Sequence, residues 1–307
     1  MSKNEIQAGV ERLAATHGPW LYDVPLPGGV WTAGNQGAPH TRLKRIAQII
    51  GDLLPQPLSE ARILDLGCLE GQFAVEMAQH GAHAVGVEVR DSNFAKANFL
   101  KETLQLDNVE FRQDDVRNLS RDKYGQFDAI ICSGLLYHLT AEDAAGVIRI
   151  MHDLATRCVI IDTHISLVGS EDVSLNGNTY PGHRFVEHAA GDSDATKAGR
   201  PLASADNDYS FWFTRPSLAN LLAHAGFSSV YECFTPTHLN FGKPGLEHPD
   251  RCTFVAIKGE KVDLTTSPAA NRTSEDLPEG SLTFAPPAAS WSRPARLVER
   301  VVKRFHS

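Results

Sequence analysis

The sequence has 307 residues, 42% of them hydrophobic and 21% charged, and is therefore long enough for one large domain or two small ones. Its formal net charge of −8 argues against a general surface for nucleic acids or other polyanions. It contains no apolar run of 18 residues and no signal-peptide pattern at Met1, so we expect a cytoplasmic protein that neither spans a membrane nor is secreted.

Residues 1–40 are expected to form a cap on the rest of the chain. Apolar residues recur with helical spacing over residues 4–17, which predicts a short helix. The stretch that follows is rich in glycine, proline and aromatic residues, so we expect an irregular segment that covers another surface. A second amphipathic helix is predicted over residues 41–54, where the main domain begins.

The main domain, residues 41–258, alternates short apolar runs with helix-like stretches. This order is typical of a doubly wound α/β fold, in which helices cover both faces of a parallel sheet. Strands are expected at RILDL, HAVGVEV, VEFRQ, FDAIICS, RCVIIDT, SSVYECF and RCTFVAIKG. Helices are expected over 71–81, 91–106, 141–155 and 213–227. Asp91 or Ser92 would cap the second of these helices, and Thr214 the last.

Two parts of the chain depart from this alternation. Residues 164–210 are rich in Gly, Ser, Asn, Asp and His and form too long a connection for a compact domain, so we expect a lid-like insert. Residues 259–307 are rich in Thr, Ser, Pro and Ala, which predicts a flexible tail. The tail ends in a short basic amphipathic pattern that could contact an anionic membrane surface or a partner protein weakly.

Acidic residues follow three strands of the predicted sheet, at the edge where such sheets bind ligands. The first strand ends in a D-x-G-x-x-x-G turn over residues 65–71, whose glycines let a ligand approach the backbone. Glu88 ends the second strand, where a carboxylate can accept hydrogen bonds from both hydroxyls of a ribose. Asp114 or Asp115 follows the third strand and could accept a hydrogen bond from an adenine amino group.

The turn after the first strand is flanked by Asp65 and Glu70 and lacks the glycine spacing typical of phosphate-binding loops. Acid near the turn suits a cationic ligand that carries an ammonium group and a sulfonium. We therefore favour binding of S-adenosylmethionine over binding of a dinucleotide. Leu69 stands where such turns often have a further glycine, and we expect its side chain to point away from the ligand.

The motifs ILDLGCLEG, VGVEV, VEFRQDDVRNL and FDAIICSGLLYHL, spaced as they are, resemble those of class I S-adenosylmethionine-dependent methyltransferases. The last motif is similar to the fourth-strand signature of small-molecule methyltransferases and of enzymes that modify the wobble uridine of tRNA. The resemblance covers roughly Thr41 to Lys258. It implies a Rossmann-like sheet of seven strands, mostly parallel with an antiparallel last strand, and S-adenosyl-L-methionine as the methyl donor.

The resemblance also implies a set of cofactor-binding residues. Matched to the motifs of the family, they are Asp65, Gly67, Cys68, Gly71, Glu88, Asp114, Asp115, Val116, Ser133 and Gly134. The methionine part would lie against the first turn and the end of the fourth strand. The ribose would lie against Glu88, and the adenine against Asp115 and the backbone of Val116.

Methyl transfer needs a catalytic base only when the nucleophile must lose a proton. The candidates at the carboxyl edge are His138 in LLYHL, His164 in DTHIS, and Tyr137. The alternative for all three is a structural position in the pocket wall. Aromatic residues that we expect to close the acceptor pocket are Trp20, Tyr22, Trp31, Tyr209, Phe211 and Trp212.

Other groups of residues allow further interpretations. His183, Glu187, His188 and Asp192 lack the spacing of a metal site, so no metal is expected there. Arg184 could instead recognise an acidic group of a substrate. The five cysteines are scattered and lack metal spacing, and we expect them to be reduced thiols, most of them buried.

We therefore expect a methyltransferase that transfers a methyl group from S-adenosyl-L-methionine to an oxygen of a small-molecule or glycan-like acceptor and releases S-adenosyl-L-homocysteine. One alternative is a tRNA-modifying enzyme, against which the net charge of −8 stands. The other is a cofactor-binding protein of the same fold without methyl transfer activity, which a turn crowded by Leu69 would favour.

Overall fold

The computed structural model describes residues 1–34, 41–233 and 250–259. By their contacts, all the described residues belong to one compact unit. The expected tail, with its basic amphipathic end, lies outside the described residues from residue 260 onward. Within the described part of the chain, no helix has the length and apolar character needed to cross a membrane.

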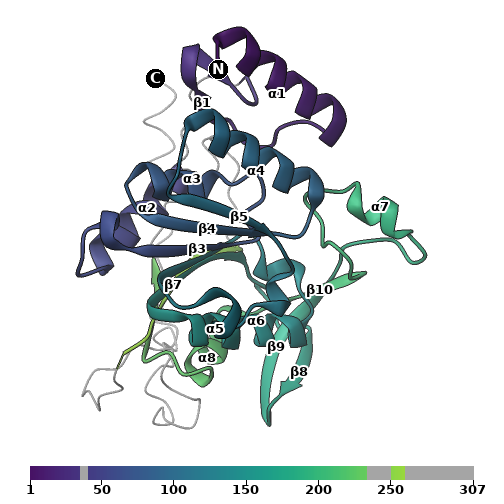
Figure 1. The fold of residues 1–307 in the computed structure, drawn as a ribbon. Coiled ribbons are helices and arrows are strands. Elements are labelled where there is room, and N and C mark those ends of the chain that lie inside the picture. The colour runs from purple at the N-terminus through teal and green to yellow at the C-terminus, as the bar shows by residue number, and fades with distance from the viewer. Residues whose placement is uncertain (35–40, 234–249, 260–307) are drawn as a thin grey trace, which may run out of the picture. The chain divides into compact units, whose positions relative to one another are not determined.

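A seven-stranded sheet stands at the centre of this unit (Figure 1). Its strands are β3 (Arg62–Leu66), β4 (His83–Glu88), β5 (Val109–Gln113), β6 (Phe127–Ser133), β7 (Ala155–His164), β11 (Ser229–Cys233) and β12 (Arg251–Ile257). Their order is β11-β12-β7-β6-β3-β4-β5. The first five are parallel, whereas β12 runs antiparallel to both of its neighbours. The predicted doubly wound fold with an antiparallel last strand is confirmed.

Helices cover both faces of the sheet, as Figure 1 shows. One face carries α2 (Thr41–Leu53), α3 (Gln72–Gln79) and α4 (Asp91–Leu104), and α1 (Lys3–His17) packs against α4. The other carries α5 (Arg121–Tyr124), α6 (Ala141–Leu154) and α8 (Arg215–His224). Successive strand residues pack to opposite sides, so that Ile63 joins the core under α3 and Leu64 joins the core under α6. Both side chains are fully buried, which explains why these strands are continuous apolar runs.

Short elements link these layers. They are the two-residue strands β1 (Pro25–Leu26) and β2 (Val30–Trp31), and the 3-10 helices η1 (Pro27–Gly29), η2 (Leu58–Glu60), η3 (Val116–Asn118) and η4 (Leu136–His138). The caps of the longer helices were predicted in part. The side chain of Thr214 accepts the N–H of Ser217 and caps α8 as expected. The N-cap of α4 is Arg90 and not Asp91 or Ser92, because the chain already turns into the helix after Arg90.

The insert after β7 is ordered, and it contains strands that the sequence analysis did not predict. β8 (Glu171–Leu175), β9 (Asn178–Val186) and β10 (Tyr209–Phe213) form a three-stranded antiparallel sheet. Asn176 and Gly177 both have positive φ between β8 and β9, as a two-residue hairpin turn requires. After β9 the chain passes through α7 (Asp194–Ala198) and returns along residues 197–206, which we call the lid segment.

Candidate active site

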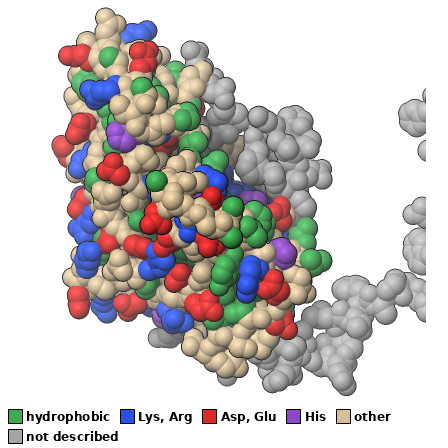
Figure 2. All heavy atoms as spheres, turned by 90° about the vertical axis from the view of Figure 1, so that its right-hand side faces the viewer, with side chains coloured by type: hydrophobic (Ala, Val, Ile, Leu, Met, Phe, Trp, Pro, Cys, Tyr) green, Lys and Arg blue, Asp and Glu red, His purple; other side chains and the backbone are tan. Residues whose placement is uncertain are grey.

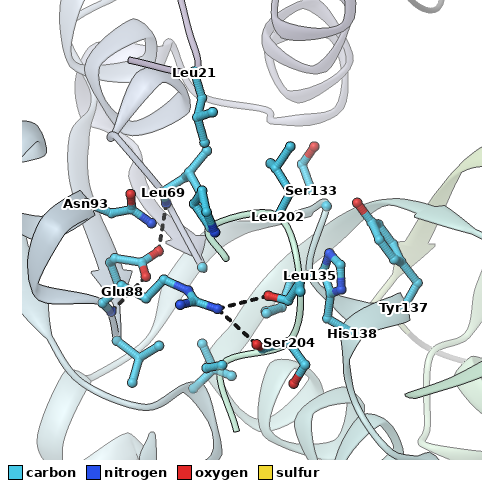
Figure 3. A pocket seen from close by; sticks show the side chains of 18 of the residues that line it. Leu21, Leu69, Glu88, Asn93, Ser133, Leu135, Tyr137, His138, Leu202 and Ser204 are labelled. Atoms are coloured by element: carbon cyan, nitrogen blue, oxygen red, sulfur yellow. Dashed lines mark hydrogen bonds between the residues drawn. The ribbon is translucent and has the colours of Figure 1, made fainter. Parts of the chain in front are cut away.

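A cavity of about 580 Å³ opens at the carboxyl ends of β3, β4, β5 and β6. Its walls come from the turns after these strands, from residues 21–22 of the N-terminal segment and from residues 201–206 of the lid segment. Figure 3 shows Glu88 on one side of the cavity and Tyr137 and His138 on the other. The predicted site residues that line it are Gly67, Glu88, Asp114, Asp115, Val116, Ser133, Gly134, Tyr137 and His138.

The turn between β3 and α3 brings backbone to the cavity wall. Gly71 has φ of 88°, and a Cβ atom there would lie 2.6 Å from the ring of Phe111, so only glycine fits. Leu69 adopts φ of 53° although it has a side chain, and it lines the cavity. Leu69 therefore belongs to the cavity wall, and the expectation that its side chain points away from the ligand stays a prediction. The hydrogen bond from its N–H to Glu88 holds the turn in this conformation.

Asp65, Cys68 and Gly71 are not among the residues that line the cavity. Asp65 is 2% exposed and accepts a hydrogen bond from the backbone N–H of Ala74, over 3.2 Å. Burial raises the pKa of Asp65 to about 8. This carboxyl therefore holds the first turn of α3 and does not present a charge to the cavity directly.

Glu70, the second acid of the turn, faces the N-terminal segment. Its side chain is fully buried and forms an ion pair with Lys96 over 2.9 Å. The same carboxylate accepts the backbone N–H groups of Leu21 and Tyr22, each over 3.0 Å. Glu70 therefore fixes the segment that carries one wall of the cavity, and the interpretation that it lies next to a cationic ligand was wrong.

Glu88 is 5% exposed and lines the cavity from the end of β4. Its two oxygens accept the backbone N–H groups of Leu69 over 2.9 Å and of Arg90 over 2.8 Å. Burial raises the pKa of this carboxyl, and the two backbone hydrogen bonds partly oppose the rise. Each carboxylate oxygen has a second lone pair, so Glu88 can still accept hydrogen bonds from a ligand.

Asp114 and Asp115 both line the cavity beyond β5, but each already has a cationic partner. Asp114 accepts hydrogen bonds from Lys123 and from the hydroxyl of Tyr124. Asp115 accepts the backbone N–H and the guanidinium of Arg117. Burial would raise the pKa of each carboxyl, but these hydrogen bonds outweigh it and lower both pKa values.

Arg90 and Arg117 fasten the lid segment over this side of the cavity. The guanidinium of Arg90 donates hydrogen bonds to four backbone carbonyls, those of Lys197, Ala198, Ala203 and Ser204, over 2.8 to 3.3 Å. Arg117 forms an ion pair with Asp206 at the far end of the lid segment. Arg90 lies two residues after Glu88 and Arg117 two residues after Asp115, so the lid segment is attached to the same loops that carry these two lining acids.

His138 belongs to η4 and faces the cavity opposite Glu88. Its Nδ1 lies 2.9 Å from Oε1 of Glu187, at the end of β9, and the Glu187 side chain is 2% exposed. Glu187 also accepts hydrogen bonds from the hydroxyl of Ser210 and the backbone N–H of Ser204. Burial would raise the pKa of Glu187, but the hydrogen bonds from His138, Ser210 and Ser204 lower it below the ordinary value.

His164 is not among the residues that line the cavity, although it contacts Tyr137, which is. Its Nδ1 lies 2.7 Å from a carboxylate oxygen of Asp250, and its Nε2 lies 3.2 Å from Nη1 of Arg251. The ring stacks on Trp212 at a centroid distance of 5.1 Å. His164 therefore has a polar partner at each ring nitrogen and supports the cavity wall from behind.

Two arginines that the sequence analysis did not single out, Arg42 and Arg251, line the cavity. Arg251 is 9% exposed and forms an ion pair with the buried carboxylate of Asp162 over 2.6 Å. Arg42 lies 3.6 Å from the same carboxylate and donates a hydrogen bond to the hydroxyl of Tyr22 over 2.6 Å. Asp162 is not a lining residue, so the positive groups of this cluster face the cavity and the carboxylate lies behind them.

Two further polar groups at the cavity have no protein partner within the described part of the chain. They are Oε1 of Gln72, at the start of α3, and the hydroxyl of Ser133, at the end of β6. Buried polar atoms are almost always hydrogen-bonded in native proteins. A polar ligand bound in the cavity would supply the missing hydrogen-bond partners of these two groups.

The aromatic residues expected around the acceptor have several different roles. Tyr22 lines the cavity, and Trp212 stacks between His164 and Phe185. Trp20 and Phe211 are core residues, 7% and 5% exposed. Trp31 lies in β2 and Tyr209 begins β10, and neither is a lining residue.

The polar residues of the insert pair with one another and with the sheet edge. His188 lies 2.9 Å from the carbonyl oxygen of Ser204, and Asp192 pairs with Arg200. Among the described residues there is no group of three or more His, Cys, Asp and Glu side chains that could hold a metal ion. Arg184 lies over the ring of Tyr209 and near Glu171, away from the cavity. Cys68, Cys132, Cys158 and Cys252 are buried free thiols.

Comparisons with known proteins agree with this geometry. Residues 63–157 match the family described as methyltransferase domain. Together with the fold, this match decides the identity of the domain. Residues 63–157 carry a methyltransferase domain. The resemblance that the sequence motifs indicated is thereby confirmed.

Relatives of this methyltransferase domain include the ubiquinone biosynthesis O-methyltransferase of Acinetobacter baylyi, 27% identical over an alignment of 157 residues that covers 47% of this chain. The chain spans only 65% of that enzyme's length. Among solved structures, the N-terminal domain of EvdMO1, crystallised with S-adenosylhomocysteine and D-fucose, is 24% identical with a TM-score of 0.63, over 84% of this chain and 98% of that one. The 1,6-didemethyltoxoflavin-N1-methyltransferase of Burkholderia thailandensis is 20% identical with a TM-score of 0.50, over 74% and 80%.

Proposed function

We propose that this protein transfers a methyl group from S-adenosyl-L-methionine to a hydroxyl oxygen of a small-molecule or glycan-like acceptor. The observation that carries the proposal is the carboxylate of Glu88, which is buried, fixed by two backbone amides and faces the cavity at the end of β4. A carboxylate in this position can accept the hydroxyls of a ribose. The curated relative named above is an O-methyltransferase, which supports transfer to oxygen.

The cavity fits the proposed cofactor in size and in polar groups. Its volume of about 580 Å³ lies in the range of small-molecule sites, roughly 300–1,000 Å³. Glu88 would hold the ribose, and the backbone near Asp115 and Val116 would hold the adenine. Gln72 and Ser133 would supply the acceptors for an ammonium group, because their oxygens have no partner within the described part of the chain. Arg42 would hold the carboxylate of the methionine part.

When bound, the cofactor supplies a methyl group already activated by its attachment to a positively charged sulfur. The protein then has to position the acceptor, exclude water and accept the proton of the hydroxyl. The lid segment covers the cavity, and Tyr137 and His138 lie across from Glu88, where an acceptor could approach the methyl group. Asp65, Cys68 and Gly71 would act indirectly, by shaping the turn that carries Gly67.

The distribution of charged side chains on the surface favours a small acceptor over a tRNA. The face of the molecule drawn in Figure 2 mixes acidic and basic side chains, with hydrophobic side chains gathered in one part of it. It shows no continuous basic surface of the kind that binds a nucleic acid backbone. The net charge of −8 acts in the same direction.

Titration calorimetry with S-adenosylhomocysteine tests the proposal. We expect the wild-type protein to bind it and Glu88→Ala to bind about 10- to 100-fold more weakly, because a hydrogen bond to a charged group is lost. Glu110→Ala, which removes an exposed carboxylate from the neighbouring strand, is the matched control and should bind as the wild type does. Absence of binding to the wild type, or equal binding by all three proteins, would contradict the proposal.

A further inference from the structure

The pair of His138 and Glu187 joins the cavity to the insert. His138 follows β6 of the main sheet, whereas Glu187 follows β9 of the insert, 49 residues later. Glu187 is held on three sides, because Oε1 accepts from His138 and Ser210 and Oε2 accepts the N–H of Ser204. Its side chain is 2% exposed, so a change of hydrogen-bond partner would require the insert to move.

The contact with Glu187 determines which ring nitrogen of His138 carries the proton. The hydrogen bonds to Glu187 hold the carboxylate in its ionised form in spite of burial, and an ionised carboxylate only accepts hydrogen bonds. Nδ1 of His138 must therefore carry the proton that it donates to Glu187. In the neutral ring this leaves Nε2 without a proton, and no side chain or backbone group of the described residues hydrogen-bonds to Nε2.

The second histidine of the site lacks this property. Nδ1 of His164 pairs with Asp250, but Nε2 accepts a hydrogen bond from Arg251, so neither nitrogen is left to take a proton from a ligand. His164 also lies behind the cavity wall, whereas His138 forms part of it. Of the two, only His138 has both a fixed tautomer and access to the cavity.

We propose that Glu187 is a positioning residue that presents Nε2 of His138 as the base for methyl transfer, and that the acceptor is therefore an aliphatic alcohol. This inference rests on the proposed function. A carboxylate acceptor is already ionised at neutral pH and needs no base, and a phenol, which ionises near pH 10, depends on a base less than an aliphatic alcohol does. An alcohol holds its proton about as firmly as water does and therefore gains the most from a base.

Methyl transfer with His138 as the base forms two bonds and breaks two. The acceptor oxygen forms a bond to the methyl carbon with one of its electron pairs, while the carbon–sulfur bond of the donor breaks and leaves its pair on sulfur. The hydroxyl proton passes to Nε2 of His138. The resulting imidazolium carries protons on both nitrogens and is stabilised by the carboxylate of Glu187 until the proton leaves to solvent. No oxidant, reductant or metal is needed.

Nitrogen NMR tests the positioning role without any acceptor. In ¹⁵N-histidine-labelled protein bound to S-adenosylhomocysteine, with the resonances assigned by a His138→Gln variant, we expect His138 to carry its neutral proton on Nδ1. In Glu187→Gln, the side-chain amide can donate to the ring, and we expect the proton to move to Nε2. Glu187→Asp should keep the wild-type tautomer. Glu171→Gln, at an exposed site on β8, is the control and should leave the spectrum of His138 unchanged.

Two NMR outcomes would overturn the proposal. One is a wild-type His138 protonated on Nε2, and the other is a Glu187→Gln variant in which the tautomer stays the same. A purely structural Glu187 would lower the melting temperature of the variant without moving this proton. Binding of S-adenosylhomocysteine, measured on the same samples, separates these results from failure of the proposed function, because that failure would abolish binding in the wild type.

Activity tests the substrate class. The release of S-adenosylhomocysteine is measured with methyl glycosides of common hexoses and 6-deoxyhexoses, and with a matched set of phenols and carboxylic acids. We expect turnover with an alcohol, and a fall in kcat of about 100-fold or more in both Glu187→Gln and His138→Gln, with KM changed only a few-fold. The double variant should be no slower than either single variant, because the two residues act as one unit. Turnover restricted to phenols or acids overturns the assignment, as does no turnover with any alcohol by a protein that binds S-adenosylhomocysteine.

Discussion

The carboxylate of Glu88 accepts a hydrogen bond from the backbone N–H of Leu69 over 2.9 Å. This contact joins the turn after β3 to the end of β4, two places that sequence motifs identify separately. It also explains how a leucine is held at φ of 53°, because the amide must face Glu88 for the bond to form. The shape of the cavity wall therefore depends on both residues at once.

Replacement of Leu69 separates the backbone strain from the contact with the ligand. In Leu69→Gly the strain of a left-handed residue, about 1–2 kcal/mol, is relieved, and the extra freedom of glycine in the unfolded chain offsets it. We expect the free energy of unfolding to change by less than about 1 kcal/mol. Leu69→Ala keeps the strain and loses the same side chain, so it should be less stable than Leu69→Gly.

Both Leu69 variants should bind S-adenosylhomocysteine about 3- to 10-fold more weakly, because an apolar wall of the cavity is lost. Denaturant unfolding and calorimetry measure the two effects on the same samples. If Leu69→Gly were less stable than Leu69→Ala, the strain at this position would be too small to matter.

Replacement of Arg90 should release the lid segment. Arg90→Ala removes four hydrogen bonds to backbone carbonyls of residues 197–204, and we expect faster hydrogen exchange in peptides of that segment. Dissociation of S-adenosylhomocysteine should become about 10-fold faster, because the lid segment covers the cavity. Arg149→Ala, on the exposed side of α6, is the control. Unchanged exchange over residues 197–206 would show that other contacts hold the lid segment closed.

Asp65 should make the stability of the protein depend on pH. Its folded-state pKa of about 8 lies above the ordinary value of 3.8, so unfolding releases a proton between these two pH values. The stability that Asp65 contributes is present below pH 4 and is lost as the pH rises toward 8, with a slope of up to about 1.4 kcal/mol per pH unit.

Asp65→Asn keeps an acceptor for the N–H of Ala74 but cannot ionise, so its unfolding free energy should fall less than that of the wild type between pH 5 and pH 8. Asp107→Asn, which changes an exposed turn residue, should follow the wild type. Denaturant titrations across this pH range provide the comparison, and equal slopes for Asp65→Asn and the wild type would refute the prediction.

The buried pair of Glu70 and Lys96 should be essential for attachment of the N-terminal segment. Lys96→Met leaves the carboxylate of Glu70 buried without its cation, and we expect a loss of about 3–5 kcal/mol in unfolding free energy. Exchange of the amides of Leu21 and Tyr22, which bond to the same carboxylate, should accelerate. Lys44→Met, at an exposed position of α2, should be neutral. A double variant with Glu70→Gln should recover part of the loss, because no buried charge remains.

The strands of the sheet could be predicted from the sequence because the pattern that marks a buried strand lies within the strand itself. A strand buried on both faces has to be a continuous apolar run, and residues such as Ile63 and Leu64 show that pattern directly. Thr214 could also be predicted as an N-cap, because a threonine directly before a helix with proline in its first turn favours that position. The lining positions of Glu88 and Gly134 follow from their place at strand ends.

The roles of Glu70, Glu187 and Arg90 could not be predicted, because each depends on a partner far away in the chain. Glu70 looks like an acid of the binding turn until Lys96 and the N-terminal segment surround it. Glu187 was considered only as a possible metal ligand, because its distance from His138 is set by the hairpin of the insert. The Asn-Gly pair at residues 176–177 is the signal that predicts this hairpin, and with it the return of Glu187 to the sheet edge.

The place of β12 in the sheet has a consequence for the order in which the protein folds. β12 pairs with β7 from Arg251 to Ile257, and its partners lie nearly one hundred residues earlier, so a long loop must close before the pairing forms. Strands β3 to β6 are connected more locally, and we expect them to assemble first. Since Arg251 lines the cavity, the ligand site becomes complete only when this last strand has docked, and ligand binding should report the final step of folding.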